Sequence, residues 1–432
     1  MGRSKIENPQ SPYSDPSKTT MTRALSNLYF FGLEALARGK FIRAKQVLDR
    51  MQQRDPENPL TLELSGDYAR EIGEKDEAFE YYIKLTDASK SAESRAVGFM
   101  NLGSLSQQLW RFDDAIGYFQ NALDLYEELG YHEDTFHARN AMNVILHEVG
   151  KYQEAFDESE KLLHRIKANR HRYLYMDVAL DSRRIMADSL RFLNRFDEAE
   201  HQWQRIQQIA TKYNLKEDLA DALDGIGIIR QLQGRFEEAK EFHRDALRIN
   251  RAIRVYDRQS MNLINLSRIH MQLGDLGRAE RCAQQSLKIE LKLENVPGIE
   301  FARLVMAQIK ISRKDYSNAL RELLRLEKTS PIKNPRDDWV AIANQLGYVY
   351  RMLGNLDEAE KRQLKVLAWA RKNKQFEVTA AACDELAEIA IARSNKKLAR
   401  EYLDQTLRCF ISLELTPMIE ATQRRIDELE LD

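Results

Sequence analysis

The side chains of this sequence that could do chemistry form no catalytic or metal-binding motif. The eight histidines include no His-x-x-x-His pair, and the three cysteines (Cys282, Cys383 and Cys409) lack the spacing of metal ligands. The run DGIG at 224–227 is similar to the start of a dinucleotide-binding fingerprint, but it lacks the third glycine and no strand pattern precedes it. We therefore predict that the protein is not an enzyme and holds no cofactor or metal, although an active site assembled from distant segments would leave no motif.

Charged side chains near the middle of the chain have the chemistry of a binding surface instead. Arg184 and Arg191 are seven residues apart, so a helix would place them on one face, where they could clamp a carboxylate. Asp188 lies between them, and Asp181 and Asp224 lie close by in the same pattern. The alternative interpretation is a network of ion pairs between helices that neutralises itself.

The amino-acid composition restricts the classes of partner that the protein can bind and its location in the cell. Lys plus Arg total 66 and Asp plus Glu total 67, and this formal net charge of −1 argues against nucleic-acid binding, which needs a basic excess. No stretch approaches the ~20 apolar residues of a membrane span. The first 20 residues contain no apolar run typical of a secretory signal. We expect a cytoplasmic protein with no membrane span.

The elements that must position these side chains are helices in a regular repeat. From about Thr22 the periodicity is helical, and no strand pattern follows. Ten alanines, at steps of 34, 37, 40 and 44 and then five times 40 residues, open the second helix of each predicted helix pair: Ala44, Ala78, Ala115, Ala155, Ala199, Ala239, Ala279, Ala319, Ala359 and Ala399. Because five equal steps are very hard to obtain by chance, we predict a repeat array, which a chain of this length also favours over a single core.

Two further positions recur with each alanine. An apolar side chain stands three residues before it in eight of the ten repeats, and a small residue stands twelve before it in every repeat except at Asn143. We expect the small residues to permit close contact between the two helices of a pair. A glycine usually ends the first helix, but Trp110 and Lys314 are among the residues that replace it.

The segments NLGSLSQQLWRFDDA (101–115) and QLGYVYRMLGNLDEA (345–359) show this pattern most clearly. Their register resembles the tetratricopeptide repeat, and the resemblance extends over residues 22–416. Steps of 40 rather than 34 residues resemble the long-period subclass of kinesin light chains, Pins-type proteins and MalT-like or Rap-like sensors. We expect connectors between repeats, such as 128–134 and 212–218, to hold the six extra residues.

The resemblance implies an all-α fold, a right-handed α–α superhelix (solenoid) of about ten helix pairs. Residues 21–416 would form ten tetratricopeptide-like repeats. Residues 417–432 would form a C-terminal capping helix, which such arrays need for solubility. Residues 1–20, rich in Ser, Pro, Lys and Asn, would be a disordered tail.

The resemblance also implies that the first helix of each repeat lines a concave groove, through positions 15, 11 and 8 residues before each alanine. We expect sixteen residues at or beside these positions to bind the partner: Asn101, Asn140, Arg184, Asp188, Arg191, Met261, Ile264, Asn265, Arg268, Met271, Phe301, Leu304, Ile311, Asn344, Tyr348 and Arg351. Repeats 7 and 8 would supply an apolar subsite, because apolar residues on a face meant for solvent are costly unless covered. The alternative is ordinary core packing in a slightly rotated register.

We therefore predict a non-catalytic protein–protein interaction scaffold, or adaptor, that binds a peptide or an amphipathic helix of another protein in this groove. The alternative function is a regulatory module that senses a ligand or peptide, as in MalT-like or Rap-like proteins. The basic stretch 161–172 is either a docking patch for an acidic partner or a solvated helix end. Tyr29, Phe30, Leu33 and Leu36 of repeat 1 have no preceding repeat to cover them, so we expect the 1–20 tail, the partner or a second subunit in a homo-oligomer to cover this end.

Overall fold

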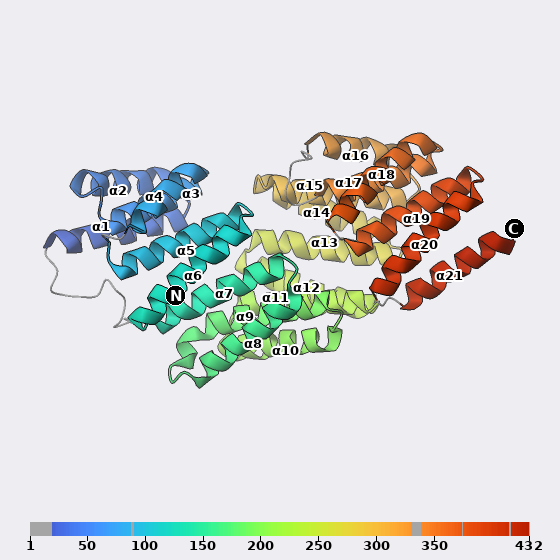
Figure 1. Cartoon of the computed structure of the whole chain (residues 1–432). Helices are drawn as coiled ribbons and strands as arrows, with labels where there is room; N and C mark the ends of the chain where they lie inside the picture. Colours follow the sequence, from blue (N-terminus) through green and yellow to red (C-terminus); the bar gives the residue numbers. More distant parts are fainter. Residues whose placement is uncertain (1–19, 88–89, 330–337, 374, 414–415, 432) are drawn as a thin grey trace. The chain divides into compact units, whose positions relative to one another are not determined.

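The computed structural model describes residues 20–87, 90–329, 338–373, 375–413 and 416–431 (Figure 1). This part of the chain contains 21 α-helices, one short 3-10 helix and no strand, as the predicted all-α fold requires. The predicted tail lies outside the described residues, apart from Thr20. The chain divides into two compact units, with unit 1 ending at Ile206 and unit 2 beginning at Gln207.

Unit 1 contains nine α-helices, the 3-10 helix and the first part of a tenth helix, which continues into unit 2: α1 (Thr20–Ala37), α2 (Phe41–Arg54), α3 (Pro59–Glu71), α4 (Lys75–Leu85), α5 (Ala92–Gln108), α6 (Phe112–Leu129), α7 (His132–Glu148), α8 (Tyr152–Ala168), η1 (Arg172–Tyr175), α9 (Met176–Phe192) and α10 (Phe196–Tyr213). The remaining helices belong to unit 2: α11 (Lys216–Leu232), α12 (Phe236–Ile253), α13 (Tyr256–Gln272), α14 (Leu276–Lys292), α15 (Val296–Ser312), α16 (Tyr316–Thr329), α17 (Asp338–Met352), α18 (Leu356–Lys372), α19 (Phe376–Ala392), α20 (Lys396–Ser412) and α21 (Thr416–Leu431).

The predicted repeat register is confirmed at every pair. Each second helix begins three residues before its marker alanine, as α6 does at Phe112 and α12 at Phe236. All ten marker alanines are at most 1% exposed, because each lies where the second helix packs against the first. Helices α1 to α20 thus form ten pairs, and α21 follows as a single helix.

The first helix of a pair ends at a residue in the left-handed region, five positions before the alanine. Gly234 has a φ of 74° there, and glycine adopts this conformation without a steric penalty. Trp110 (φ 60°) and Lys314 (φ 61°) adopt the same conformation, so the departures from glycine leave the turn intact. Each of these two side chains adds a local strain of roughly 1–2 kcal/mol.

The six extra residues of the long repeats lie in the helices, so the prediction that connectors hold them is wrong. Helices α3 and α4 of the short second repeat have 13 and 11 residues, whereas α5 and α6 have 17 and 18. Only Gly130 and Tyr131 separate α6 from α7. Buried side chains continue into the last turn of α6, as at Tyr126, so a further helical turn extends the core where a longer loop would not.

Several small residues on the first helices lie directly against side chains of the second helix of their pair, which is the close contact that we predict. A methyl group added at Gly103 would come within 2.6 Å of the Phe119 ring. Gly66 faces Tyr82 in the same way, and Gly227 faces His243. The glycines therefore allow bulky residues of the second helix to lie directly against the first helix.

Successive first helices contact one another within each unit, as α5 and α7 do in unit 1 and α13, α15, α17 and α19 do in unit 2. One face of each unit is therefore a row of first helices, and we call it the first-helix face. No described helix is long and apolar enough to cross a membrane.

Candidate functional site

Exposure along α13 identifies the residues that the first-helix face presents to solvent. Met261 is 48% exposed, and Arg268 and Met271 are half-buried further along the helix. These residues stand 18, 11 and 8 positions before Ala279. The position 15 before the alanine, Ile264, points into the protein instead.

The expectation that Ile264 and Leu304 face an open groove is therefore wrong. Ile264 is only 2% exposed and packs in the core with Ala279 and Val305. Leu304 is 9% exposed and belongs to the neighbouring core of α15, α16 and α17. The face that is open to solvent is rotated by one helical position from the predicted face. For Ile264 and Leu304 the alternative interpretation, ordinary core packing, therefore holds.

The rest of the apolar subsite stays near the surface of unit 2. Phe301, Met271 and Ile311 are partly buried, each packed at the edge of a core cluster. Arg268 lies over the Phe301 ring, with the guanidinium carbon 4.9 Å from the ring centroid. Arg268, Met271 and Phe301 therefore lie together on α13 and α15, and Met261 stands seven residues before Arg268 on the same helix. We call these four residues the Arg268 site.

The two arginines of the predicted polar subsite in unit 1 already have carboxylate partners. Arg184 pairs with Asp181, and Arg191 Nε lies 3.4 Å from Asp188 Oδ1, in both cases on α9. Burial raises the pKa of Asp188, and the charge of Arg191 opposes that shift. This arrangement follows the self-neutralised alternative, and the carboxylate clamp remains a prediction.

An aromatic cluster that the sequence did not indicate lies beside Arg191. The rings of Tyr152 and Phe192 stack with centroids 4.6 Å apart, and His147 lies 5.2 Å from Tyr152. The Arg191 guanidinium carbon is 4.1 Å from the Phe192 ring centroid. His147 Nδ1 is 3.0 Å from the Ser189 hydroxyl, and burial lowers the pKa of this histidine. These contacts fasten α7, α8 and α9 together.

The predicted asparagines have differing environments. Asn140 is buried and accepts a 3.1 Å hydrogen bond from the Ser182 hydroxyl, whereas Asn101 is half-buried on α5. Asn344 accepts from the side-chain amide of Gln363 at 2.9 Å. The partners of Asn140 and Asn344 are internal, so a ladder of free asparagines is absent from these positions.

Asn265 belongs to a hydrogen-bond network around Asp224 in unit 2. Asp224 Oδ1 lies 2.6 Å from both His243 Nδ1 and Asn262 Nδ2, and 3.3 Å from Asn265 Nδ2. Burial alone would raise the pKa of Asp224, but the hydrogen bonds and the charge of His243 outweigh it and lower the pKa. The DGIG run thus forms part of a structural polar core on α11 that positions α12 and α13.

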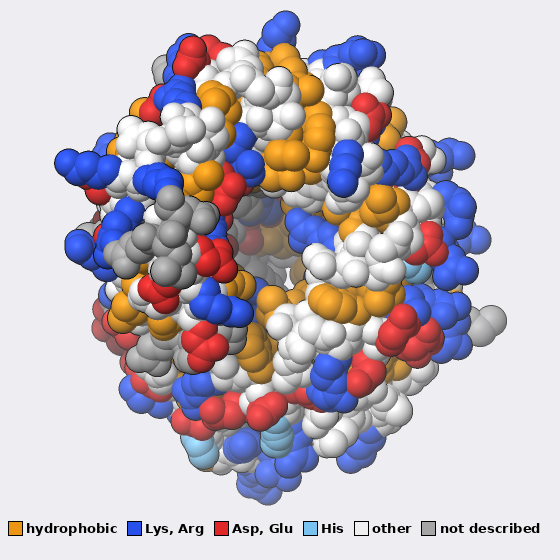
Figure 2. All heavy atoms as spheres, turned by 90° about the vertical axis from the view of Figure 1, so that its right-hand side faces the viewer, with side chains coloured by type: hydrophobic (Ala, Val, Ile, Leu, Met, Phe, Trp, Pro, Cys, Tyr) orange, Lys and Arg blue, Asp and Glu red, His pale blue; other side chains and the backbone are white. Residues whose placement is uncertain are grey.

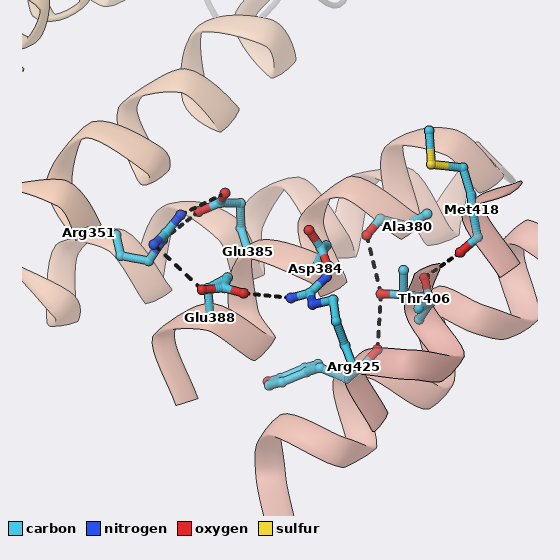
Figure 3. A network of polar contacts seen from close by, with 10 residues as sticks. Arg351, Ala380, Asp384, Glu385, Glu388, Thr406, Met418 and Arg425 are labelled. Atoms are coloured by element: carbon cyan, nitrogen blue, oxygen red, sulfur yellow. Dashed lines mark hydrogen bonds and ion pairs between the residues drawn. The ribbon is translucent and has the colours of Figure 1, made fainter. Parts of the chain in front are cut away.

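Arg351 forms the beginning of a row of ion pairs across three first helices (Figure 3). Its Nε lies 2.9 Å from Glu385 Oε2 on α19, and its Nη1 lies 3.8 Å from Glu388 Oε2. Glu388 lies between the two arginines, because Arg425 of α21 is 2.6 Å from its other oxygen and also pairs with Asp384. We call these five residues the charge row. Arg351 is therefore saturated by internal carboxylates.

The sequence reasoning missed the acidic and basic partners in the charge row. They could have been found, because Glu385 and Arg425 occupy the same position of successive first helices, 40 residues apart. Tyr348 is half-buried beside this row, with its ring 6.4 Å from that of Tyr316 and 5.2 Å from the Arg351 guanidinium.

The other charged and reactive groups have ordinary structural environments. The basic stretch 161–172 includes Lys161, which pairs with Glu158 at 2.7 Å beside a cavity of about 150 Å³ between α7 and α8. Burial raises the pKa of Cys383 to about 11, so this thiol stays protonated. Among the described residues no group of His, Cys, Asp or Glu is arranged to hold a metal ion. Basic and acidic side chains are interspersed on the face shown in Figure 2.

The end of the chain at repeat 1 is more closed than expected. Tyr29 and Leu36 are buried in a core that repeat 1 shares with α3 of repeat 2, and Leu33 packs against the same core. Of the four residues named for self-association, only Phe30 is strongly exposed, at 58%. A homo-oligomer through this end remains a prediction.

Comparison with known proteins agrees with this architecture. Among solved structures, the chain is similar to the apo form of the quorum sensor NprR from B. thuringiensis, at 16% identity over 90% of this chain and 99% of that one, with a TM-score of 0.52. It is also similar to aspartyl phosphate phosphatase F from Bacillus subtilis, at 13% identity over 84% of this chain and 97% of that one, with a TM-score of 0.52. NprR in complex with its cognate peptide NprX matches at 15% identity over 78% and 97% of the two chains, with a TM-score of 0.51. These identities show a shared fold alone.

Sequence families identify the repeats directly. No curated protein gives a significant match. Residues 94–165 match the tetratricopeptide repeat, and residues 184–408 match the MalT-like TPR region. The second match covers more than half of the 432 residues. The chain therefore belongs to the MalT-like tetratricopeptide repeat family.

Proposed function

We propose that this chain is a non-catalytic interaction module that binds a peptide or a helix of another protein on the first-helix face of unit 2. The observation that carries the proposal is the Arg268 site. There, the cation of Arg268 lies over the partly buried Phe301, with Met271 in the same cluster and the exposed Met261 further along α13, on a face that the repeats leave open. Apolar side chains gathered on such a face gain free energy when a partner covers them.

The alternative function is a regulatory module that senses a peptide. The similarity to NprR, a quorum sensor whose structure is known with its cognate peptide, supports this alternative. A sensor changes conformation when its ligand binds, because the ligand prefers one of two states. Small-angle scattering of the chain with and without a bound peptide distinguishes the two functions, since a scaffold keeps its radius of gyration.

The binding function is tested by selecting peptides from a randomised display library with the full-length protein. Met261→Asp places a charge in the Arg268 site and should abolish capture of the selected peptides. Leu291→Asp is the matched control, because Leu291 is similarly exposed, at 51%, but lies on the second helix α14. Both variants should melt like the wild type. Equal capture by wild type and Met261→Asp, or equal loss with both variants, contradicts the proposed site.

A further inference from the structure

Arg268 is a half-buried cation without an anionic partner. No carboxylate of the described residues lies within ion-pair distance of it, and it makes no hydrogen bond to them, whereas Arg351 on the same face contacts two glutamates. Burial alone lowers the pKa of Arg268, because no nearby negative charge opposes the loss of water. A guanidinium that is partly removed from water and unpaired is unfavourable, so an external anion at this position gains more than one at a fully solvated arginine.

The geometry of the site orients the guanidinium for a planar anion. The contact with the Phe301 ring, at 4.9 Å, holds the guanidinium by stacking and cation–π attraction. Stacking leaves the N–H groups at the edge of the guanidinium free, and a carboxylate can accept from two of them at once. Met261 and Met271 lie at two positions of the same helix face, and their flexible side chains adapt to an apolar neighbour of the anion.

Side-chain amides flank the site on both sides. Gln231 stands on α11, Gln308 on α15 and Gln345 on α17, each half-buried at a position of the first-helix face. None of these three amides forms a hydrogen bond within the described part of the chain, and each offers a donor and an acceptor. A polypeptide backbone that crosses α11, α13, α15 and α17 can therefore be bound on both sides of Arg268.

We propose that Arg268 binds the side-chain carboxylate of an Asp or Glu inside an extended peptide, next to a large apolar residue that covers Met271. The amides on both sides favour an internal residue over a chain terminus. Among the described residues, Arg268 is a single unpaired cation with no second basic residue beside it. Its one positive charge matches one carboxylate, whereas a nucleic-acid backbone needs several positive charges to bind it. This inference rests on the proposed function and adds the chemistry of the partner.

The test uses an array of nonapeptides that carry Glu, Gln or Lys at the central position, with randomised flanks and with amidated or free C-termini. The full-length wild type should bind Glu-centred peptides at least tenfold more tightly than their Gln-centred counterparts. Arg268→Gln should remove this preference, and Arg268→Lys should keep part of it because the charge remains. Arg268→Glu should reverse the preference toward Lys-centred peptides, which also shows that the variant is folded. Arg303→Gln is the matched control, since Arg303 is an exposed arginine of α15 away from the site, and it should behave like the wild type.

Each of the remaining outcomes of this experiment contradicts either the proposed function or the assignment of Arg268. If the wild type binds no peptide of the array, the proposed function fails and this inference with it. If peptides bind without a preference for Glu, or if Arg268→Gln keeps the preference, only this inference fails. Loss of binding on amidation would assign Arg268 to a terminal carboxylate instead. A change in the molecular mass in solution caused by Arg268→Gln would assign the face to a second copy of the chain.

Discussion

Replacement of Gly103 by alanine has two opposing effects on the free energy of unfolding, and the size of each is known. Alanine in a helix interior is more favourable than glycine by about 1 kcal/mol. The added methyl group would lie 2.6 Å from two carbons of the Phe119 ring, and this ring is fully buried, so it has no free space into which to move. Overpacking of this kind costs about 1–3 kcal/mol. Because two ring carbons clash at once, we expect the upper part of that range and a net destabilisation of about 1–2 kcal/mol.

Gly117 of α6 provides the matched control, because a methyl group added there has no neighbour within 4 Å. Gly117→Ala should therefore stabilise the protein by about 0.5–1 kcal/mol. Urea unfolding followed by circular dichroism measures both changes, and thermal melts should shift by about 2–4 °C per kcal/mol. Phe119→Leu should lessen the effect of Gly103→Ala, since a smaller side chain leaves room. If Gly103→Ala stabilises the protein as Gly117→Ala does, the close packing of α5 on α6 is refuted.

Three further predictions concern the core, a buried acid and a turn. Ile264→Asp combined with Leu304→Asp should abolish the cooperative thermal melt, because burial of each unpaired charge in the core costs several kcal/mol. If the two residues only bound a partner, the melt would stay unchanged. Burial raises the pKa of Glu63 to about 7, so its protonated form stabilises the fold. The contribution of Glu63 to the free energy of unfolding is fully present below about pH 4.5 and is lost as the pH rises through 7. Glu63→Gln should therefore flatten the pH dependence of the free energy measured by urea unfolding. Lys314→Gly should raise the free energy of unfolding by about 1 kcal/mol, because glycine adopts the φ of 61° without strain, and an unchanged urea midpoint would contradict this.

The repeat register could be predicted from the sequence because it depends on residues of one type at fixed spacing. The marker alanines and the residues that begin the second helices recur at the same positions in every pair, so a repeating local pattern is enough to indicate them. The open face of the first helices could not be located to one helical position. Ile264 and Met261 are both apolar and differ by three residues, and only the angle between neighbouring first helices decides which is buried.

The pairing of charged side chains could likewise not be predicted from the sequence pattern. Arg268 and Arg351 are both arginines on the first-helix face, and the sequence predicts the same partner-binding role for both. Their difference comes from the next first helix, which presents Phe301 to one and Glu385 to the other. Such pairs depend on which residues of successive helices lie side by side, a relation that the register of a single repeat does not contain.

The matching of glycines to bulky residues has a consequence for how such an array can be recombined. Gly66 and Tyr82, Gly103 and Phe119, and Gly227 and His243 are each 16 residues apart within one helix pair. A crossover in the turn inside a pair would place a glycine opposite a small side chain and leave a void, or an alanine opposite a ring and create a clash. A crossover in the connector between pairs keeps every match. Exchange of whole helix pairs should therefore preserve these matches, and chimeras designed from this chain should be joined at those connectors.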